Sequence, residues 1–166
     1  TAGRTVISDY GHNASALLAL VDAIRRMPHK RRSIVYTAAG DRRDIDIMEQ
    51  AKIIGTHFDE VYLYEDQCTR GRKDGEVIRL MRVGLGDTLR AKRIHETRGE
   101  RNAIENALER LERGDLLLCQ VDQVEDALGW IEKKLGALEV QWSSRTAGAR
   151  LSGYTASDLL SLVFRT

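Results

Sequence analysis

Residues 8–13, SDYGHN, place an acid, a phenol, an imidazole and an amide in one short segment. The segment lies between a short apolar run and an amphipathic stretch, where a strand would give way to a helix. Asp9 and His12 could face a ligand at this point. A simpler interpretation is also open, in which Asn13 or Ser15 caps the helix and Asp9 merely ends the strand.

A second polar segment, GDRRD at residues 40–44, combines two carboxylates with two arginines. The helix dipole favours a carboxylate at the start of a helix, so Asp44 alone has a structural explanation. The arginines do not, because a positive charge is unfavourable at that end. Adjacent opposite charges suit a zwitterionic or cationic substrate, and we expect Asp41, Arg42 and Asp44 to bind it.

A third segment, EDQCTRGRKDGE at residues 65–76, mixes acids and cations with Thr69 and two glycines. Arg70 and Arg72 could hold a carboxylate through two parallel hydrogen bonds. Asp66 could bind an amine or a guanidinium. A solvated surface loop is the alternative for this composition. The pattern is typical of a site for an amino acid, with acids for its cationic groups and arginines for its carboxylate.

Several nucleotide and metal motifs are missing from the sequence. It has no GxxxxGK[ST] phosphate loop, and no dinucleotide-binding glycine pattern follows its first apolar run. It also lacks a G-x-S-x-G elbow and a His/Cys cluster with zinc spacing. We therefore expect no catalytic residue and no metal site on this chain. The missing motifs still allow one interpretation, in which this chain is a lobe that closes over a nucleotide held by another domain.

The elements that would position these segments alternate along the chain. Runs typical of strands and stretches typical of helices follow one another, at 5–8, 14–27, 33–40, 44–58, 60–65, 74–85, 91–96, 100–114, 115–121 and 124–136. This alternation predicts an α/β, Rossmann-like fold with a mainly parallel sheet of about five or six strands and helices on both faces.

The polar segments would lie together at one edge of that sheet. Parallel sheets bind ligands at the carboxyl ends of their strands, beside the helix N-termini. The polar segments each follow a strand, so we expect Asp9 and Asp41 on the same edge. These segments are 8–13, 40–44, 65–74 and 95–101. The loops at the opposite edge look like solvated connectors and comprise residues 28–33, 56–60, 86–92 and 113–115.

The composition is typical of a soluble globular protein, with 42% hydrophobic and 31% charged residues and a net charge of +1. This balance creates no field toward nucleic acid or an anionic membrane. The basic residues within 25–33 lack aromatic partners, so we expect no nucleic-acid binding. No apolar stretch approaches the roughly 20 residues of a membrane helix. Cys68 and Cys119 form no CxxC motif, and we expect reduced thiols and a cytoplasmic location.

The order and spacing of the motifs resemble the C-terminal domain of the Mur ligase superfamily. DYGHN before an amphipathic stretch, then GDRRD, then EDQCTRGR carry the resemblance, which covers about residues 4–136. The doubled arginine of GDRRD and the TRGR of the third segment are most similar to the Mur-ligase-like region of cyanophycin synthetase. Ala14 departs from the proline expected after DYGHN, and this change affects rigidity rather than chemistry.

The resemblance implies an enzyme that joins a carboxylate to an amine through an acyl-phosphate, using ATP and magnesium held mainly by a central domain. The C-terminal lobe would close over the nucleotide and receive the incoming amino acid. In cyanophycin synthetase this is arginine, added to the aspartate side chain of a poly-aspartate backbone. Asp9, His12 and Asn13 would face the nucleotide. The amino acid would be surrounded by Asp41, Arg42, Asp44, Asp66, Thr69, Arg70 and Arg72.

The chain begins TAGRTV without a methionine, and we expect it to be part of a longer protein. Its partners would be the other domains of the same synthetase, without which it would be inactive; self-association stays open. Residues 4–136 would form the Mur-ligase C-terminal-like domain. Residues 137–166 would be a tail of no assigned role, with a short helix over 157–164.

Two alternatives stay open. A non-catalytic Rossmann-like module could bind a small anion or a protein through the same edge. The equivalent lobe of a peptidoglycan (Mur) or folylpolyglutamate ligase would carry similar motifs. An ATP-grasp region and a GTNGKT-type loop in the upstream sequence would favour the ligase over the binding module.

Overall fold

The computed structural model describes residues 3–66, 69–86, 88, 90–122, 124–135, 139–143 and 161–165. Its parallel strands are β1 (Thr5–Asp9), β2 (Arg32–Tyr36), β3 (Glu60–Glu65), β4 (Arg93–Arg98) and β5 (Leu116–Gln120). Its helices are α1 (Ala14–Ile24), α2 (Asp44–His57), α3 (Glu76–Leu85), α4 (Glu100–Glu109) and α5 (Val124–Leu135). The predicted α/β alternation with a mainly parallel sheet is confirmed.

The strand order in the described part is β4-β3-β2-β5-β1-β7-β6. β5 lies between β2 and β1 in the middle of the sheet. The loop after β2 leads to α2 on one face of the sheet, and the loop after β5 leads to α5 on the other face. β7 (Ser161–Arg165) pairs antiparallel with β1, and β6 (Glu139–Ser143) pairs antiparallel with β7. Among the described residues, the sheet therefore consists of five parallel strands, in line with the five or six expected, and two added antiparallel strands.

The strand β7 also replaces part of the short helix expected over 157–164. Pairing explains the difference, because without β7 the backbone groups along one side of β1 would form an exposed edge. Residues 144–160 lie outside the described residues. A domain boundary at residue 136 stays a prediction, although two strands beyond it join the sheet.

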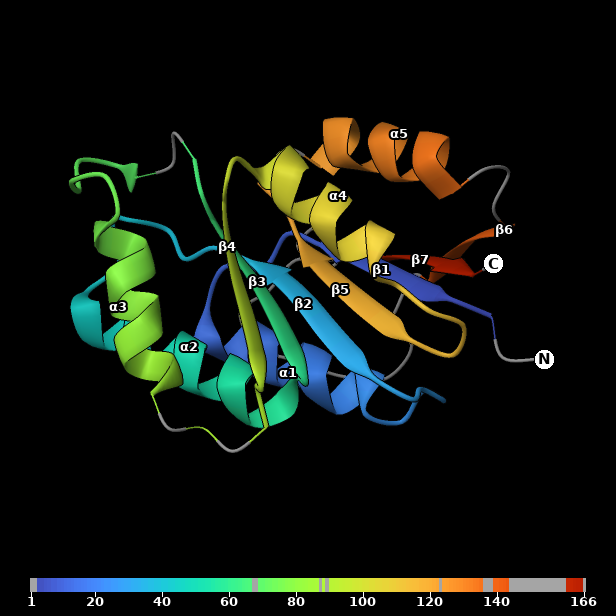
Figure 1. The fold of residues 1–166 in the computed structure, drawn as a ribbon, viewed down its shortest axis with the longest axis horizontal. Coiled ribbons are helices and arrows are strands. Elements are labelled where there is room, and N and C mark those ends of the chain that lie inside the picture. Colours follow the sequence, from blue (N-terminus) through green and yellow to red (C-terminus); the bar gives the residue numbers. More distant parts are fainter. Residues whose placement is uncertain are drawn as a thin grey trace.

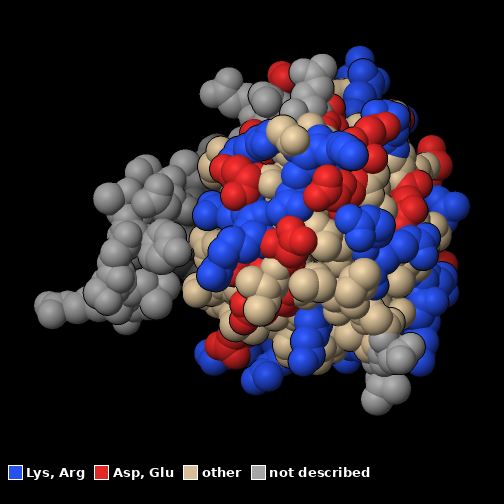
Figure 2. Space-filling model, turned by 90° about the vertical axis from the view of Figure 1, so that its left-hand side faces the viewer, with Lys and Arg blue, Asp and Glu red and all other residues tan. Residues whose placement is uncertain are grey.

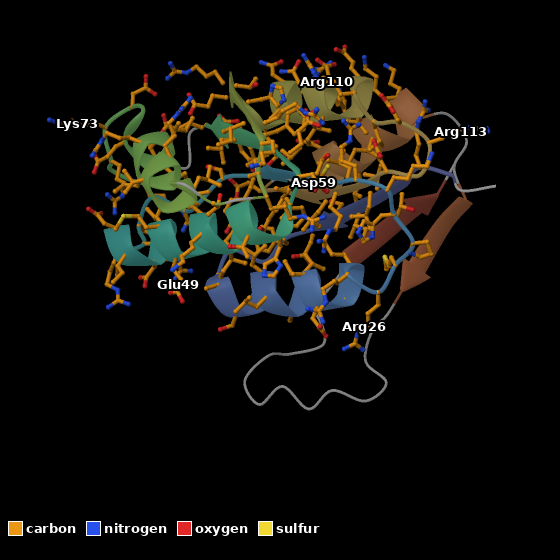
Figure 3. All side chains as sticks on the ribbon, turned by 60° about the horizontal axis from the view of Figure 1, so that its bottom comes forward. Arg26, Glu49, Asp59, Lys73, Arg110 and Arg113 are labelled. Atoms are coloured by element: carbon orange, nitrogen blue, oxygen red, sulfur yellow. The ribbon has the colours of Figure 1, made fainter. Side chains whose placement is uncertain are left out.

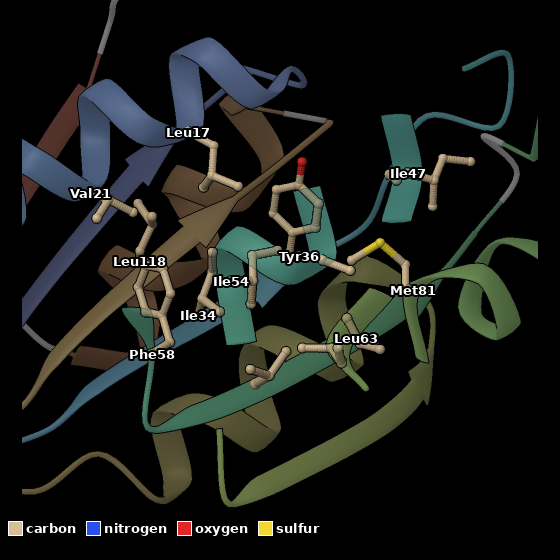
Figure 4. Packing of buried hydrophobic residues seen from close by; sticks show 14 of the residues in the cluster. Leu17, Val21, Ile34, Tyr36, Ile47, Ile54, Phe58, Leu63, Met81 and Leu118 are labelled. Atoms are coloured by element: carbon tan, nitrogen blue, oxygen red, sulfur yellow. The ribbon is translucent and has the colours of Figure 1, made fainter. Parts of the chain in front are cut away.

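The helices cover both faces of the sheet, with α1, α2 and α3 on one side and α4 and α5 on the other (Figure 1). Successive side chains of a strand point to opposite faces. In β2, Ile34 and Tyr36 enter the core beneath α1, α2 and α3, whereas Val35 enters the core beneath α4 and α5. Figure 4 shows the first of these cores, where Tyr36 lies near Ile47 and Ile54 of α2.

Two predicted helices end earlier than expected. α1 ends at Ile24 rather than residue 27, because the residue before Pro28 is disfavoured in helical conformation. α4 ends at Glu109 rather than residue 114. No helix in the described ranges is both long and apolar enough to cross a membrane. Cys119 is a buried free thiol, and Cys68 lies outside the described residues.

The segments at the amino ends of the strands, which the sequence suggested are solvated connectors, contain exposed residues but also three buried charged ones. Arg32, Glu60 and Asp115 are 5%, 1% and 4% exposed. Arg31 holds two of these segments together, since its Nη1 lies 3.1 Å from a carboxylate oxygen of Glu60 and its Nη2 lies 2.5 Å from one of Asp115. The prediction was wrong at these three residues, because Arg32 and Glu60 begin strands and Asp115 directly precedes one, so their side chains are buried at the end of the sheet.

Candidate substrate-binding site

The predicted polar loops share the carboxyl edge of the sheet. The strand register pairs Asp9 of β1 with Gln120 of β5, and Tyr36 of β2 with Leu63 of β3. The loops that follow these strands therefore leave the sheet at the same edge, and Asp9 and Asp41 lie on it together, as predicted. Figure 2 views this side and shows Lys and Arg intermingled with Asp and Glu. Such a surface suits a ligand that carries both charges.

Asp9 and Asn13 hold the backbone of the loop between β1 and α1. Asp9 is 5% exposed, and its Oδ2 accepts a hydrogen bond from the backbone nitrogen of Gly11 at 3.0 Å. Asn13 caps α1, because its Oδ1 accepts a hydrogen bond from the backbone nitrogen of Ala16 at 2.8 Å. The capping interpretation of Asn13 is therefore observed, and its side-chain oxygen is already used.

His12 pairs with a residue that the sequence did not single out. Its Nε2 lies 2.8 Å from the Oδ1 of Asp122, and the two side chains are 10% and 19% exposed. The ring of Tyr10 meets the His12 ring edge-on, with centroids 5.3 Å apart. A carboxylate on one ring nitrogen fixes the orientation of an imidazole. The only signal for Asp122 was an acid directly after the apolar run 115–121.

Arg72 fastens the loop after β2 to the start of α3. Its side chain is 16% exposed, and its Nη1 lies 2.8 Å from carboxylate oxygens of both Asp44 and Glu76. Its Nε donates to the carbonyl oxygen of Gly40 at 2.7 Å, and its Nη2 donates to that of Arg42 at 2.6 Å. These acceptors use most of the five N–H groups of the guanidinium. A role for Arg72 in holding a substrate carboxylate stays a prediction.

Asp41 and Arg70 form an exposed ion pair between the loops after β2 and β3. The Nη1 of Arg70 donates to the Oδ2 of Asp41 at 2.9 Å, and about half of each side chain is exposed. This hydrogen bond holds the pKa of Asp41 below its ordinary value. Exposed pairs contribute little to stability. The two groups can therefore exchange partners with a zwitterionic ligand at small cost.

The same two loops touch at Gly40 and Thr69. A Cβ at position 40 would lie 1.9 Å from the carbonyl oxygen of Thr69, so only glycine allows this approach. Arg42, two residues further along, is exposed on the surface of its loop. Through this contact the loop that Arg72 holds adjoins Thr69, which lines the neighbouring cavity.

Asp66 and Thr69 line a cavity of about 690 Å³ at the carboxyl ends of β3 and β4. A second cavity, of about 290 Å³, continues from it along β4. The carboxylates that line the two cavities are those of Glu65, Asp66, Asp74 and Glu96. Arg98 also lines both, and its Nη2 lies 2.6 Å from Asp74. The lining is dominated by acids, which suits a cationic ligand.

Two buried carboxylates at this edge were not predicted. Glu65, 8% exposed, accepts hydrogen bonds from the backbone nitrogens of Gly75 and Val77 and so caps α3. Glu100, also 8% exposed, accepts from the Tyr64 hydroxyl at 3.0 Å. Glu100 also accepts a hydrogen bond from the backbone nitrogen of Asp122, at 2.5 Å. Their sequence positions, a strand end and a helix start, are ordinary places for a carboxylate and gave no signal.

The predicted site residues thus fall into three groups along one edge. The first group lies at the end of β1 and in the loop after it, where His12 contacts Asp122 in the segment after β5. The second group surrounds Arg72, and the contact between Gly40 and Thr69 joins it to the third, which lines the cavity. The three groups are Asp9, His12 and Asn13; Asp41, Arg42, Asp44, Arg70 and Arg72; and Asp66 and Thr69.

Comparison with known proteins agrees with this architecture. The sequence matches the family model described as Mur ligase, glutamate ligase domain, over residues 1–120. A cyanophycin synthetase of Geminocystis herdmanii is 30% identical over 129 residues, which cover 78% of this chain and 15% of that protein. A UDP-N-acetylmuramoyl-L-alanyl-D-glutamate--2,6-diaminopimelate ligase of Zymomonas mobilis is 30% identical over 116 residues, covering 70% of this chain and 22% of that protein.

A solved structure of a ligase with that second name shares the fold. It superposes with a TM-score of 0.67 at 19% identity, over 80% of this chain and 30% of that one. This likeness supports the Rossmann-like fold class. The chain spans less than a quarter of the length of the curated relatives described above.

Proposed function

The chain belongs to the Mur ligase family of glutamate ligase domains, and from this premise we propose that it receives the incoming amino acid in an ATP-dependent amide ligase. The proposed enzyme resembles cyanophycin synthetase and adds arginine to the aspartate side chain of a poly-aspartate backbone. The match to a protein of that name over 78% of this chain supports the choice. The other domains of the synthetase would be its partners.

The cavity lined by Asp66 and Thr69 is the observation that carries this proposal. Its volume of about 690 Å³ falls within the range of roughly 300–1,000 Å³ of small-molecule sites. Arginine has a cationic side chain, an amine and a carboxylate. The acids of the cavity would bind the guanidinium. Arg70, once released from Asp41, or Arg98 would bind the carboxylate through two hydrogen bonds.

The proposed reaction forms an amide bond between the arginine amine and an activated aspartate side chain. The neutral amine nitrogen attacks the carbonyl carbon of an acyl-phosphate, the bond from that carbon to the phosphate oxygen breaks, and the nitrogen gives up a proton to the leaving phosphate or to water. The task of this chain would be to hold the amine in a fixed orientation, which replaces a bimolecular encounter with a positioned one. The buried carboxylates of Glu65 and Glu100 keep the cavity walls in place for this purpose.

ATP would supply the phosphoryl group that activates the carboxylate. No three His, Cys, Asp or Glu side chains in the described ranges are arranged to hold a metal ion. We therefore assign magnesium and the nucleotide phosphates to another domain. Asp9 and His12, with Asn13 fixing the helix start, would form the side of the closed cleft that faces the nucleotide.

Phosphate release by the full-length enzyme tests this function. With ATP, magnesium and an aspartate-containing primer, arginine should support turnover far better than lysine or diaminopimelate. The isolated chain should release no phosphate above the blank under the same conditions. Turnover that is independent of arginine would contradict the assignment.

A peptidoglycan ligase is the second candidate, favoured by the 30% identity to the Zymomonas mobilis ligase over 70% of this chain. That ligase is named for 2,6-diaminopimelate. If the same assay gave turnover with diaminopimelate and a UDP-linked peptide, but none with arginine, this second function would replace the first.

A further inference from the structure

At the amino edge of the sheet, a buried arginine has donors without acceptors. Arg32 begins β2 and is 5% exposed. In the part of the chain that the structure describes, neither its Nε nor its Nη1 has a hydrogen-bond partner. Burying a charged group without a partner is strongly unfavourable. These buried donors therefore need an acceptor, which water or a bound ion could supply.

Other cations surround the same place. The Nη2 of Arg90 lies 3.1 Å from Asp59, while its Nε, which is also buried, has no partner among the described residues. Burial, and then the charges of Arg90 and Arg25, lower the pKa of Arg32. Burial lowers the pKa of His57 most, and the charges of Arg32, Arg25 and Arg90 lower it further. The Oδ2 of Asp59 accepts hydrogen bonds from the backbone nitrogen of Arg32 at 2.8 Å and from the Nη2 of Arg90 at 3.2 Å, which places these two residues side by side at the start of β2.

The carboxylates of this region do not balance these cations. Asp22 forms ion pairs with both Arg25 and Arg26, and Asp59 forms one with Arg90. Counting the buried guanidinium, four arginines face two carboxylates in the described ranges. The C-terminal ends of α1 and α2 offset about half a charge each. An excess of positive charge is left even when His57 is neutral.

We propose that Arg25, Arg32, Arg90 and His57 form a binding site for a small oxyanion, such as a phosphate or sulfate group. Guanidinium groups pair with such anions through two parallel hydrogen bonds. Arg25 and Arg90, with side chains 62% and 39% exposed, form the solvent side through which the ion enters. Figure 3 labels Asp59 and Arg26, which mark the loop before β3 and the segment after α1.

This site is separate from the candidate substrate site, because it lies at the amino ends of the strands. It also gives a role to two residues of the basic stretch over 25–33, Arg25 and Arg32, which the proposed function leaves unused. The ligand chemistry is that of a tetrahedral oxyanion, either as a free ion or as the end of a phosphate ester.

The melting temperature of the chain tests the proposal. Sulfate, inorganic phosphate and phosphoserine are compared with sodium chloride at matched ionic strength. An anion at a hundred times its dissociation constant should raise the melting temperature by about 5–10 °C for a chain of this length. A larger rise with phosphoserine than with sulfate would identify an ester as the ligand, and equal rises would identify the free ion.

Two variants and one control separate this site from a general salt effect. Arg32→Met removes the unpartnered charge, so its melting temperature in chloride should not fall and the rise with anion should disappear. Arg90→Gln, at a partly exposed position, should weaken anion binding at least about tenfold. Arg26→Met, at a side chain 76% exposed, should keep the full rise.

Three outcomes would overturn the proposal. An equal rise in wild type and Arg32→Met would show that the anions act by exclusion from the protein surface. Absence of any rise in wild type would show that water completes the Arg32 site. An unchanged anion affinity in Arg90→Gln would remove the cluster from the site.

Discussion

At the amino edge of the sheet one buried carboxylate contacts several cations, whereas at the carboxyl edge two ion pairs at or near the cavity are exposed. The Glu60 side chain is 2% exposed and lies 3.1 Å from both Arg31 and Arg93 and 2.8 Å from His95. The ring of His95 also stacks on Tyr62, with centroids 4.6 Å apart. This cluster, defined here as the Glu60 cluster, cannot exchange partners without exposing a buried charge.

The exposed pairs behave in the opposite way. About half of each side chain is exposed in the pair of Asp41 with Arg70, and more than half in the pair of Asp74 with Arg98. Such pairs contribute little to stability and are screened by salt. A ligand with matching charges can replace either partner. The comparison indicates that the amino edge stabilises the fold and the carboxyl edge is available for binding.

Breaking the Glu60 cluster should have the largest effect on stability. Glu60→Gln leaves its cationic partners without their shared carboxylate, and removing one member of a buried charge cluster costs about 3–5 kcal/mol. Urea unfolding should show this loss as a lower midpoint. In the full-length enzyme the Michaelis constant for arginine should stay the same. A variant as stable as wild type would show that the cluster is not a stabilising element.

Asp66→Ala should have the opposite profile, with a large effect on function and a small one on stability. Loss of a charged partner in a binding site costs about 2 kcal/mol or more, which is roughly a thirtyfold change in affinity. The Michaelis constant for arginine should rise accordingly and that for ATP should not. Asn102→Ala, at a neutral position of the same cavity, is the matched control.

Acid should weaken the Glu60 cluster before the rest of the fold. Burial alone would raise the pKa of Glu60, but hydrogen bonds from His95, Arg93 and Tyr62 outweigh it and hold the pKa below 4.5. The folded state therefore binds this proton less tightly than the unfolded state does. Its stabilisation is complete above pH 4.5 and is lost as pH falls through the folded-state pKa.

Unfolding measured against pH checks this sign. Below pH 4.5 the free energy of unfolding of wild type should fall more steeply than that of Glu60→Gln, by at most about 1.4 kcal/mol per pH unit. Parallel curves would mean that Glu60 has an ordinary pKa in the folded chain.

An exposed pair at the carboxyl edge should give the smallest effect. Arg43 contacts Asp46 through two hydrogen bonds, of 2.9 and 2.7 Å, on the surface of α2. Asp46→Asn should leave the urea midpoint unchanged within error. A marked loss of stability would remove the contrast between the two edges.

Much of the fold could be predicted because its signals are local. The continuous apolar run of β2, which is buried on both faces, and the amphipathic stretches between strands follow from the geometry of each element. The antiparallel strands β6 and β7 could not be predicted, because β7 pairs with β1 from a distant part of the chain and β6 pairs in turn with β7. The burial of Arg32 and Glu60 was missed for the same reason, since both were assigned to connecting loops although they are the first residues of β2 and β3.

The candidate site was predictable only as far as its edge of the sheet. Parallel strands bring their carboxyl ends together, so the sequence located Asp9, Asp41 and Asp66 on one side. It did not show that backbone carbonyls of the neighbouring loop would engage Arg72. Nor did it distinguish Glu65 and Glu100 from ordinary acids at element ends. Their partners are set by tertiary contacts that have no sequence pattern.

The most direct test of the central claim is hydrogen exchange of the full-length enzyme, measured by mass spectrometry with and without saturating arginine. The account predicts slower exchange in peptides that span residues 65–75 and 98–102, where the cavity lies. Peptides that span 29–33 and 57–60, at the amino edge, should not change. Unchanged exchange over 65–75 and 98–102 at saturating arginine would contradict the claim that the carboxyl edge receives the amino acid.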